Sequence, residues 1–178
     1  MPLYLSEFPL PDEAARASSF DRIAEAIERA GGELIELQVG LDAGLLYAIA
    51  EIVDPAQLDR VLRASGVPPR AVVEVRLVGP ALDDVKRARG DAAYLVEWDL
   101  PNGLTMDEYL ARKLAKAPGY ARVPETTFLR TYVCVDMTKC LCFYRAPDAA
   151  AVLRAREAVD TPVDRLTRIA EAPRHVRA

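Results

Sequence analysis

The stretch LYLSEFPLP, residues 3–11, returns ninety positions later as AYLVEWDLP, residues 93–101. Five of the nine aligned residues are identical, and both stretches alternate as a β-strand does. A second echo follows in the same order, because residues 61–64 and residues 152–155 both read VLRA. Similarity at a fixed spacing is the signature of repeated structural units. We therefore predict a tandem repeat of one small domain.

The repeat predicts two units and a connection between them. We place the first unit at residues 1–79, a linker at 80–91, the second unit at 92–171 and a tail at 172–178. Apolar periodicity and turn residues predict the same order of elements in each unit: strand, helix, two strands, helix, strand. In the first unit these are 3–8, 12–30, 33–39, 45–53, 55–64 and 72–77; in the second they are 93–98, 106–116, 126–135, 140–145, 148–158 and 165–170.

This order is the ferredoxin-like βαββαβ motif, in which helices cover one face of a four-stranded sheet. The strands at 126–135 and 140–145 are apolar on both faces, so the second face also needs cover. Two copies in one chain can supply it by packing sheet against sheet. The predicted fold is therefore α+β, an intramolecular α+β barrel made of two ferredoxin-like repeats. The space between the two sheets is the default ligand site.

Composition excludes several classes of function. A net charge of −4 and an isoelectric point near 5.2 argue against a nucleic-acid partner, which requires a concentrated basic surface. No apolar run is long enough to span a membrane, and the N-terminus lacks a secretory pattern. Three cysteines, an odd number, suit a reducing compartment. We expect a cytoplasmic protein, monomeric or homodimeric.

Residues 94–101, 129–133 and 142–148 resemble a family of small bacterial ferredoxin-like domains. The family is mostly uncharacterised and includes a nickel-binding member. The resemblance covers most of residues 92–169, while the first half resembles the family only at residues 4–7 and around Pro68, as a diverged copy would.

Nickel would be the metal that this resemblance implies. Family members commonly carry a histidine on the second helix, where this chain reads VLRAREA over residues 152–158. The single histidine of the chain, His175, lies in the tail. We therefore predict no cofactor and treat nickel, or another soft metal, as doubtful.

Glu7 and Glu97 occupy equivalent positions of the repeated strand, on the same face as leucines. A buried carboxylate must find a partner, become neutral or reach solvent. One interpretation is a structural pair with an arginine, for which Arg130, Arg63 and Arg154 are candidates. The other is a carboxylate in a ligand pocket with a raised pKa, where Glu97 acts as acid or base.

Aromatic residues gather in the second half. They are either ordinary core residues or a polar-tipped pocket for a flat organic ligand. On the second interpretation the candidate catalytic residues are Glu97, Tyr94, Tyr132 and Tyr144, and the candidate ligand-binding residues are Glu7, Trp98, Arg130, Phe143 and Tyr120. The loop at 117–124, which has no counterpart of that length in the first half, is a candidate lid.

Cys134, Cys140 and Cys142 are weak candidates for a soft-metal site. Cys140 and Cys142 share one face of a strand, while the face of Cys134 depends on the length of the hairpin loop. With a three-residue loop over residues 137–139 Cys134 faces Cys142, whereas a two-residue or four-residue loop places it on the opposite face. Free cysteines are more often small buried core residues.

Three functions remain open. The first is a binding or accessory protein that holds a small molecule, or less readily a metal, between its sheets. The second is a cofactor-independent enzyme, such as an isomerase, a cyclase or an oxygenase-like catalyst, that uses Glu97 as acid or base, with tyrosines orienting the substrate. The third is a structural or regulatory module that binds a partner.

Overall fold

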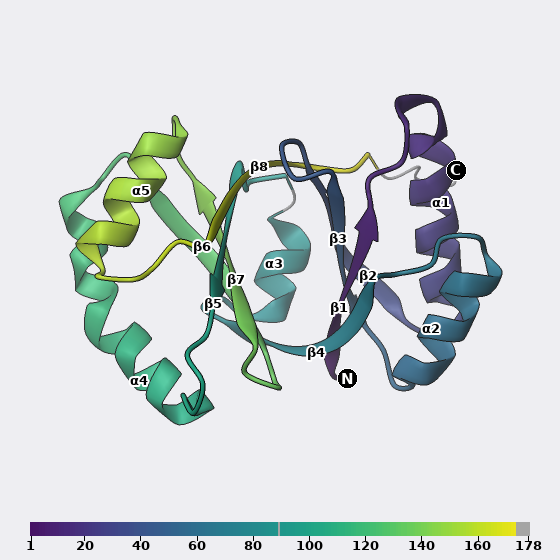
Figure 1. Ribbon diagram of the computed structural model, residues 1–178, viewed down its shortest axis with the longest axis horizontal. Helices are drawn as coiled ribbons and strands as arrows, with labels where there is room; N and C mark the ends of the chain where they lie inside the picture. The colour runs from purple at the N-terminus through teal and green to yellow at the C-terminus, as the bar shows by residue number, and fades with distance from the viewer. Residues whose placement is uncertain (89, 174–178) are drawn as a thin grey trace.

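The computed structural model describes residues 1–88 and 90–173, and this part of the chain forms a mixed α+β fold. Eight strands close into an antiparallel barrel, with five α-helices outside it or across one of its ends (Figure 1). Within these ranges no helix is long and apolar enough to cross a membrane. The predicted tail, which includes His175, lies mostly outside the described residues.

All the predicted strands and helices are present, with ends within a few residues of those expected. The first half contains β1 (Leu3–Pro9), α1 (Glu13–Arg29), β2 (Glu33–Gly40), β3 (Leu45–Glu51), α2 (Pro55–Ala64) and β4 (Ala71–Val78). The short helix α3 (Leu82–Arg87) lies in the predicted linker. The second half contains β5 (Tyr94–Asp99), α4 (Met106–Lys116), the 3-10 helix η1 (Ala117–Arg122), β6 (Thr127–Cys134), β7 (Lys139–Arg145), α5 (Ala149–Ala158) and β8 (Arg165–Glu171).

Local signals in the sequence set the ends of the helices. Asp54 and Asp148 accept hydrogen bonds from the first backbone amides of α2 and α5. Thr105 and Glu108 form a reciprocal capping box at the start of α4. After α1, Gly31 adopts a φ of 74°, the left-handed conformation that ends a helix.

The strand order places equivalent residues of the two halves at one end of the barrel. Around the barrel the order is β1-β3-β2-β8-β5-β7-β6-β4, and β4 pairs with β1 to close it. Because every neighbouring pair is antiparallel, β1 and β5 run in the same direction, four steps apart. Glu7 and Glu97, near the ends of these strands, therefore meet at the same end, which we call the mouth. At the other end, the closed end, α3 packs against the barrel.

Helices cover the outer faces of the strands in two groups. In Figure 1, α1 and α2 lie on one side of the barrel and α4 and α5 on the other, with α3 between them. The interior of the barrel forms a separate core that includes Leu5, Ile49, Leu95, Leu141 and Phe143. Both faces of the strands are thus buried, as the apolar pattern predicted.

The packed interior limits the space between the sheets, which was predicted as the default ligand site, to one end of the barrel. Apolar side chains fill the middle of the barrel, including Tyr132, Leu141 and Phe143, each fully buried. A layer of polar side chains lies at each end of this apolar middle, one at the mouth and one at the closed end. In the part of the chain that the structure describes, a pocket opens at the mouth, and the closed end has no comparable space.

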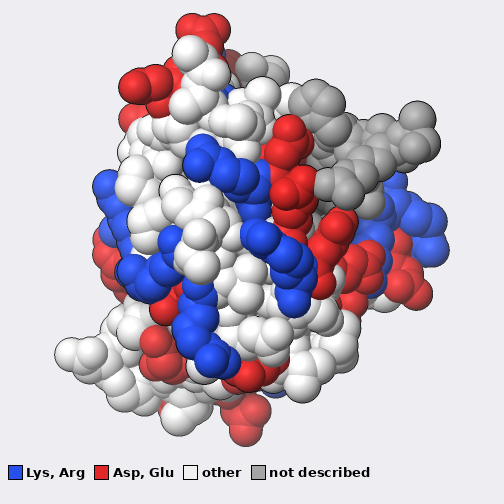
Figure 2. Space-filling model, turned by 90° about the vertical axis from the view of Figure 1, so that its right-hand side faces the viewer, with Lys and Arg blue, Asp and Glu red and all other residues white. Residues whose placement is uncertain are grey.

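Charged side chains of both signs cover the face that carries α1 and α2. Figure 2 shows basic side chains in a band across this face, with acidic side chains beside them. Such an interleaved surface matches the ordinary charge balance of the sequence.

Candidate functional site

The mouth of the barrel holds a pocket of about 450 Å³. Its walls come from both halves of the chain: β1, the β2–β3 hairpin and β3 on one side, and β5, β7 and β8 on the other. The charged and polar side chains that line it are Glu7, Asp42, Tyr47, Glu97, Lys139, Arg165 and Thr167.

Glu97 is the most buried carboxylate of this pocket, with only 3% of its surface exposed. It lies on the interior face of β5, as alternation along the strand predicted. One carboxylate oxygen is 2.8 Å from Nζ of Lys139, and the other is 3.1 Å from Nε of Arg165. The hydroxyl of Tyr47 donates a longer hydrogen bond of 3.4 Å to Glu97.

Lys139 joins the two equivalent glutamates across the mouth. Its ammonium lies 2.5 Å from a carboxylate oxygen of Glu7, on the other half of the chain. Burial lowers the pKa of Lys139, but its hydrogen bonds to Glu7 and Glu97 outweigh burial and leave that pKa raised. Lys139 is therefore a fixed positive charge between two carboxylates.

Tyr47 supplies a neutral donor beside these charges. Burial raises the pKa of its hydroxyl, and the negative charges of Glu97 and Glu7 raise it further. The phenol thus keeps its proton through the physiological pH range and donates to an acceptor.

The closed end contains a second polar layer, in which Glu36 and Arg130 are buried and Asp91 is partly exposed. Arg130 donates to both oxygens of Glu36, from Nε at 2.8 Å and from Nη2 at 2.6 Å, and also pairs with Asp91 at 3.0 Å. Tyr132 donates a short hydrogen bond to Glu36, and Gln38 donates another at 3.1 Å. No space for a ligand adjoins this layer in the described structure, so its contacts are structural.

This layer corrects the predicted partners of the repeated glutamates. Arg130 pairs with Glu36 and Asp91 rather than with Glu7 or Glu97. Arg63 pairs with Asp59 on its own helix, and Arg154 pairs with Glu125. The true partners, Lys139 and Arg165, are each the first residue of a strand. In a sequence, a single lysine or arginine at such a position is indistinguishable from an ordinary solvent-exposed residue.

The predicted tyrosines do not gather around Glu97. Tyr132 faces the barrel interior but bonds to Glu36 at the closed end. Tyr94 and Tyr144 face the helices, because residues at even positions of β5 and β7 point outward. Tyr47, which does reach Glu97, was hidden among apolar residues in the sequence of β3. Phe143 packs inside the barrel beneath Arg130, 4.9 Å from its guanidinium carbon.

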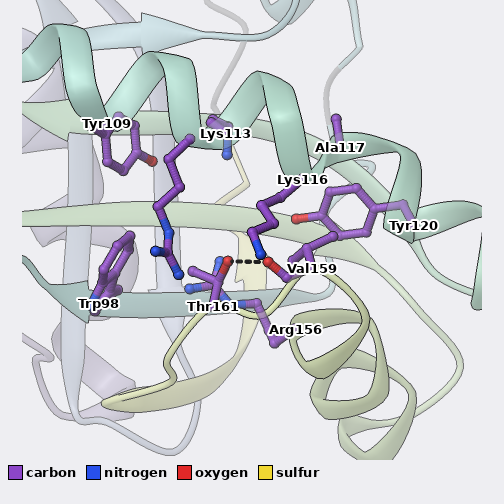
Figure 3. Close-up of a pocket in the computed structure, with 10 residues that line it drawn as sticks. Trp98, Tyr109, Lys113, Lys116, Ala117, Tyr120, Arg156, Val159 and Thr161 are labelled. Atoms are coloured by element: carbon purple, nitrogen blue, oxygen red, sulfur yellow. Dashed lines mark hydrogen bonds between the residues drawn. The ribbon is translucent and has the colours of Figure 1, made fainter.

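Trp98 and Tyr120 instead line a second pocket, outside the barrel, which we call the helix-side pocket. Figure 3 shows its side chains, which come from β5, α4, η1, α5 and the segment that follows α5. The pocket measures about 30 Å³. The loop predicted as a lid forms η1 and borders this pocket rather than the mouth. It packs so closely on α5 that a Cβ at Gly119 would lie 2.3 Å from the carbonyl oxygen of Ala158.

Arg156 and Lys113 bring positive charge into the helix-side pocket. Arg156, 3% exposed, donates to the sulfur of Cys142 at 3.5 Å and to the hydroxyl of Tyr144 at 3.3 Å. Lys113 donates to the hydroxyl of Thr131 at 3.0 Å. Arg156 follows Val152 by four residues on α5, so the two side chains share the buried face of the helix. This spacing is the sequence signal that could have identified Arg156 as a buried residue.

A third pocket, of about 360 Å³, lies beside α1 and the segment that follows α2. Its walls are mainly apolar, and its polar side chains are Asp12, Ser19 and Arg22, of which the last two hydrogen-bond to each other at 3.1 Å. It offers three polar side chains against the seven at the mouth, so it is the less polar of the two pockets.

The cysteines do not form a common metal site. Residues 135–138 form a four-residue hairpin loop, so Cys134 pairs with neither of the other two and faces the barrel interior. Cys140 and Cys142 face the helices, with their sulfurs 3.9 Å apart. In the part of the chain that the structure describes, no cluster of three or more His, Cys, Asp or Glu side chains could hold a metal ion.

Comparison with protein families supports the resemblance found in the second half. The model of the family described as nickel responsive protein SCO4226-like matches residues 94–169. No curated protein matches the chain. Nickel responsiveness is the description of that family, and the described residues of this chain offer no matching set of ligands.

Solved structures with the same fold are similar over nearly the whole chain. An anthrone oxidase-like protein superposes with a TM-score of 0.56 at 10% identity, covering 97% of this chain and 91% of the other. A "putative chlorite dismutase" gives 0.54 at 14% identity, covering 96% and 95%. A "putative monooxygenase" from Lactobacillus acidophilus NCFM gives 0.53 at 11% identity, covering 96% and 93%. At these identities the likeness establishes the fold alone.

Proposed function

We propose that the protein binds a small polar organic molecule at the mouth of the barrel. The observation that carries this proposal is the convergence of Glu7, Glu97, Lys139, Arg165 and Tyr47 on one pocket of about 450 Å³. Pockets for organic ligands commonly measure ~300–1,000 Å³ and present a few convergent polar groups.

The charges of the pocket indicate the chemistry of its ligand. Three carboxylates line it, those of Glu7, Glu97 and Asp42, against the two cations Lys139 and Arg165. A neutral or cationic molecule with hydroxyl or amine donors complements this balance better than an anion does. Tyr47 adds one donor for an acceptor atom of the ligand.

We also propose that the two halves are copies of one ferredoxin-like unit. The strand order supports this, since β4-β1-β3-β2 in the first half corresponds to β8-β5-β7-β6 in the second. On this proposal Glu7 and Glu97 are equivalent residues, and the mouth is a site shared by both copies. The boundaries 1–79 and 92–171 remain our prediction for the two units.

An enzyme at the same site is the second candidate. The contact between Tyr47 and Glu97 favours it, because a phenol and a carboxylate at one pocket can move a proton between them and a substrate. In this version Tyr47 takes the orienting role first predicted for Tyr94, Tyr132 and Tyr144. The enzymatic descriptions of the similar structures belong to those proteins and leave the reaction open here.

Native mass spectrometry of untagged protein tests the binding proposal. We expect added mass on the folded protein that disappears on denaturation. Replacing Ala43, an exposed residue of the pocket rim, by tryptophan should fill the mouth and remove that mass. The control is Leu153→Trp, an equally bulky change at an exposed position of α5. Equal occupancy in the Ala43 and Leu153 variants would contradict binding at the mouth and would favour a module without a ligand there.

A further inference from the structure

Two cations of the helix-side pocket lack a carboxylate. Among the ion pairs of residues 1–88 and 90–173, neither Lys113 nor Arg156 takes part. Their hydrogen-bond acceptors are neutral or thiol groups: Thr131 for Lys113, and Cys142, Tyr144 and the carbonyl of Pro162 for Arg156. Buried charges in proteins are normally paired, and neither of these two cations has a carboxylate partner among the described residues.

Arg156 also has a donor to spare. Its Nε is buried and has no hydrogen-bond partner, while its two terminal nitrogens are engaged. A guanidinium presents several N–H donors in one plane, and this arrangement is complementary to the oxygen atoms of a planar anion. The side chain of Arg156 lines the pocket, although its Nε is itself shielded, so what the pocket receives from Arg156 is mainly its positive charge.

The size of the pocket limits what it can hold. At about 30 Å³ it accepts a water molecule or a very small ion, but no drug-sized molecule. Aromatic side chains of Trp98, Tyr109 and Tyr120 form much of its wall (Figure 3). At the rim, Lys116 and Arg112 are 3.0 Å and 3.9 Å from Asp160, so the carboxylate there is already occupied.

We propose that the helix-side pocket is a binding site for a small planar oxyanion of charge −1, of the nitrate or formate type, held by Arg156 and Lys113. This site is separate from the mouth and goes beyond the function proposed for it. The anion supplies a second negative charge beside the two cations, and the guanidinium of Arg156 and the ammonium of Lys113 attract it electrostatically.

Cys142 does not remove the need for this anion. The hydrogen bond with Cys140 holds the pKa of the Cys142 thiol well below its ordinary range, and Lys113 and Arg156 lower it further. A thiolate would balance one positive charge and leave the second. Because burial lowers the pKa of Lys113, its ammonium gains most from a further negative charge in the pocket.

A titration with sodium nitrate tests the site. Thermal unfolding is followed at constant ionic strength, with sodium gluconate, whose anion is too large for the pocket, replacing nitrate. For the wild type we expect a saturable rise of the unfolding midpoint with nitrate. Arg156→Gln should weaken the apparent affinity about tenfold or more, because the positive charge of the guanidinium is lost. Sodium formate, in a parallel titration, should behave as nitrate does.

A matched control lies on the same helix. Arg154→Gln removes an exposed arginine that pairs with Glu125, and it should keep the wild-type response. Lys113→Met keeps the apolar stem of the side chain and removes its charge, and it too should weaken nitrate binding. It serves as the test variant if Arg156→Gln fails to fold. The proposal is overturned if nitrate and gluconate act alike on the wild type, or if the folded Arg156 or Lys113 variant responds as the wild type does.

Discussion

Replacing Glu36 by alanine is expected to lower the free energy of unfolding by about 3–5 kcal/mol. Arg130, 3% exposed, would lose both of its hydrogen bonds to Glu36 and keep only Asp91. Tyr132 would lose the acceptor of its buried hydroxyl. The large effect thus comes from polar groups left without partners inside the barrel. Urea unfolding, followed by circular dichroism, measures the change.

A second variant separates this explanation from simple loss of volume. Glu36→Leu combined with Arg130→Met removes both charges and keeps apolar bulk, so it should recover much of the stability lost in Glu36→Ala. As a surface control, Arg63→Ala breaks an exposed pair with Asp59 and should cost no more than about 1 kcal/mol. If Glu36→Ala lowers the free energy of unfolding as little as the surface control does, this layer does not stabilise the fold.

Replacing Lys139 by methionine is expected to destabilise the protein by about 2–3 kcal/mol near neutral pH. Glu7 would lose the cation that faces it, whereas Glu97 would keep Arg165. Lys116→Met, which breaks an exposed pair with Asp160, is the matched control and should cost no more than about 1 kcal/mol. Chemical denaturation of the three proteins in one buffer gives the comparison.

The contribution of Lys139 should also depend on pH in a defined direction. Although burial opposes it, contact with Glu7 and Glu97 leaves the pKa of Lys139 raised in the folded state. Its stabilisation is therefore complete below the unfolded lysine value of about 10.4 and is lost as pH rises through the folded value. The difference in stability between wild type and Lys139→Met should stay constant through neutral pH and shrink in alkaline solution. A difference that grows there would contradict the ion-paired role.

The sequence was sufficient to predict the strands, the helices and the closed α+β barrel. The repeated strand at residues 3–11 and 93–101 carried most of that prediction, because alternation assigned a face to every residue of both strands. It placed Glu7 and Glu97 inside the barrel, and the antiparallel order then brought them to one end.

The contacts of the site could not be predicted in the same way. Lys139 reaches Glu7 across 132 positions of sequence, a distance at which alternation gives no information. Tyr132 and Tyr144 lie on the neighbouring strands β6 and β7. Tyr132 faces the barrel interior, whereas Tyr144 faces the helices. The deciding facts were the four-residue hairpin and a bulge in β6, which fix the register of β6 against β7.

Residues of both halves of the chain line the mouth. The ligand-sized pocket at the mouth uses both halves, with Glu7 and Tyr47 from the first and Glu97, Lys139 and Arg165 from the second. Of the aromatic residues predicted for a site, Trp98 and Tyr120 line the smaller helix-side pocket, while Tyr132 and Phe143 lie inside the barrel.

The most direct test of binding at the mouth is a two-dimensional amide NMR titration of the wild-type protein. The probes are small polyols and primary amines, with a carboxylate of similar size as the contrasting ligand. We predict that a polyol or amine shifts the amide signals of Tyr47, Glu97 and Lys139 in a saturable way, while signals from α1 and α2 stay unchanged. Shifts confined to other parts of the molecule, or a preference for the carboxylate, would contradict the proposed site.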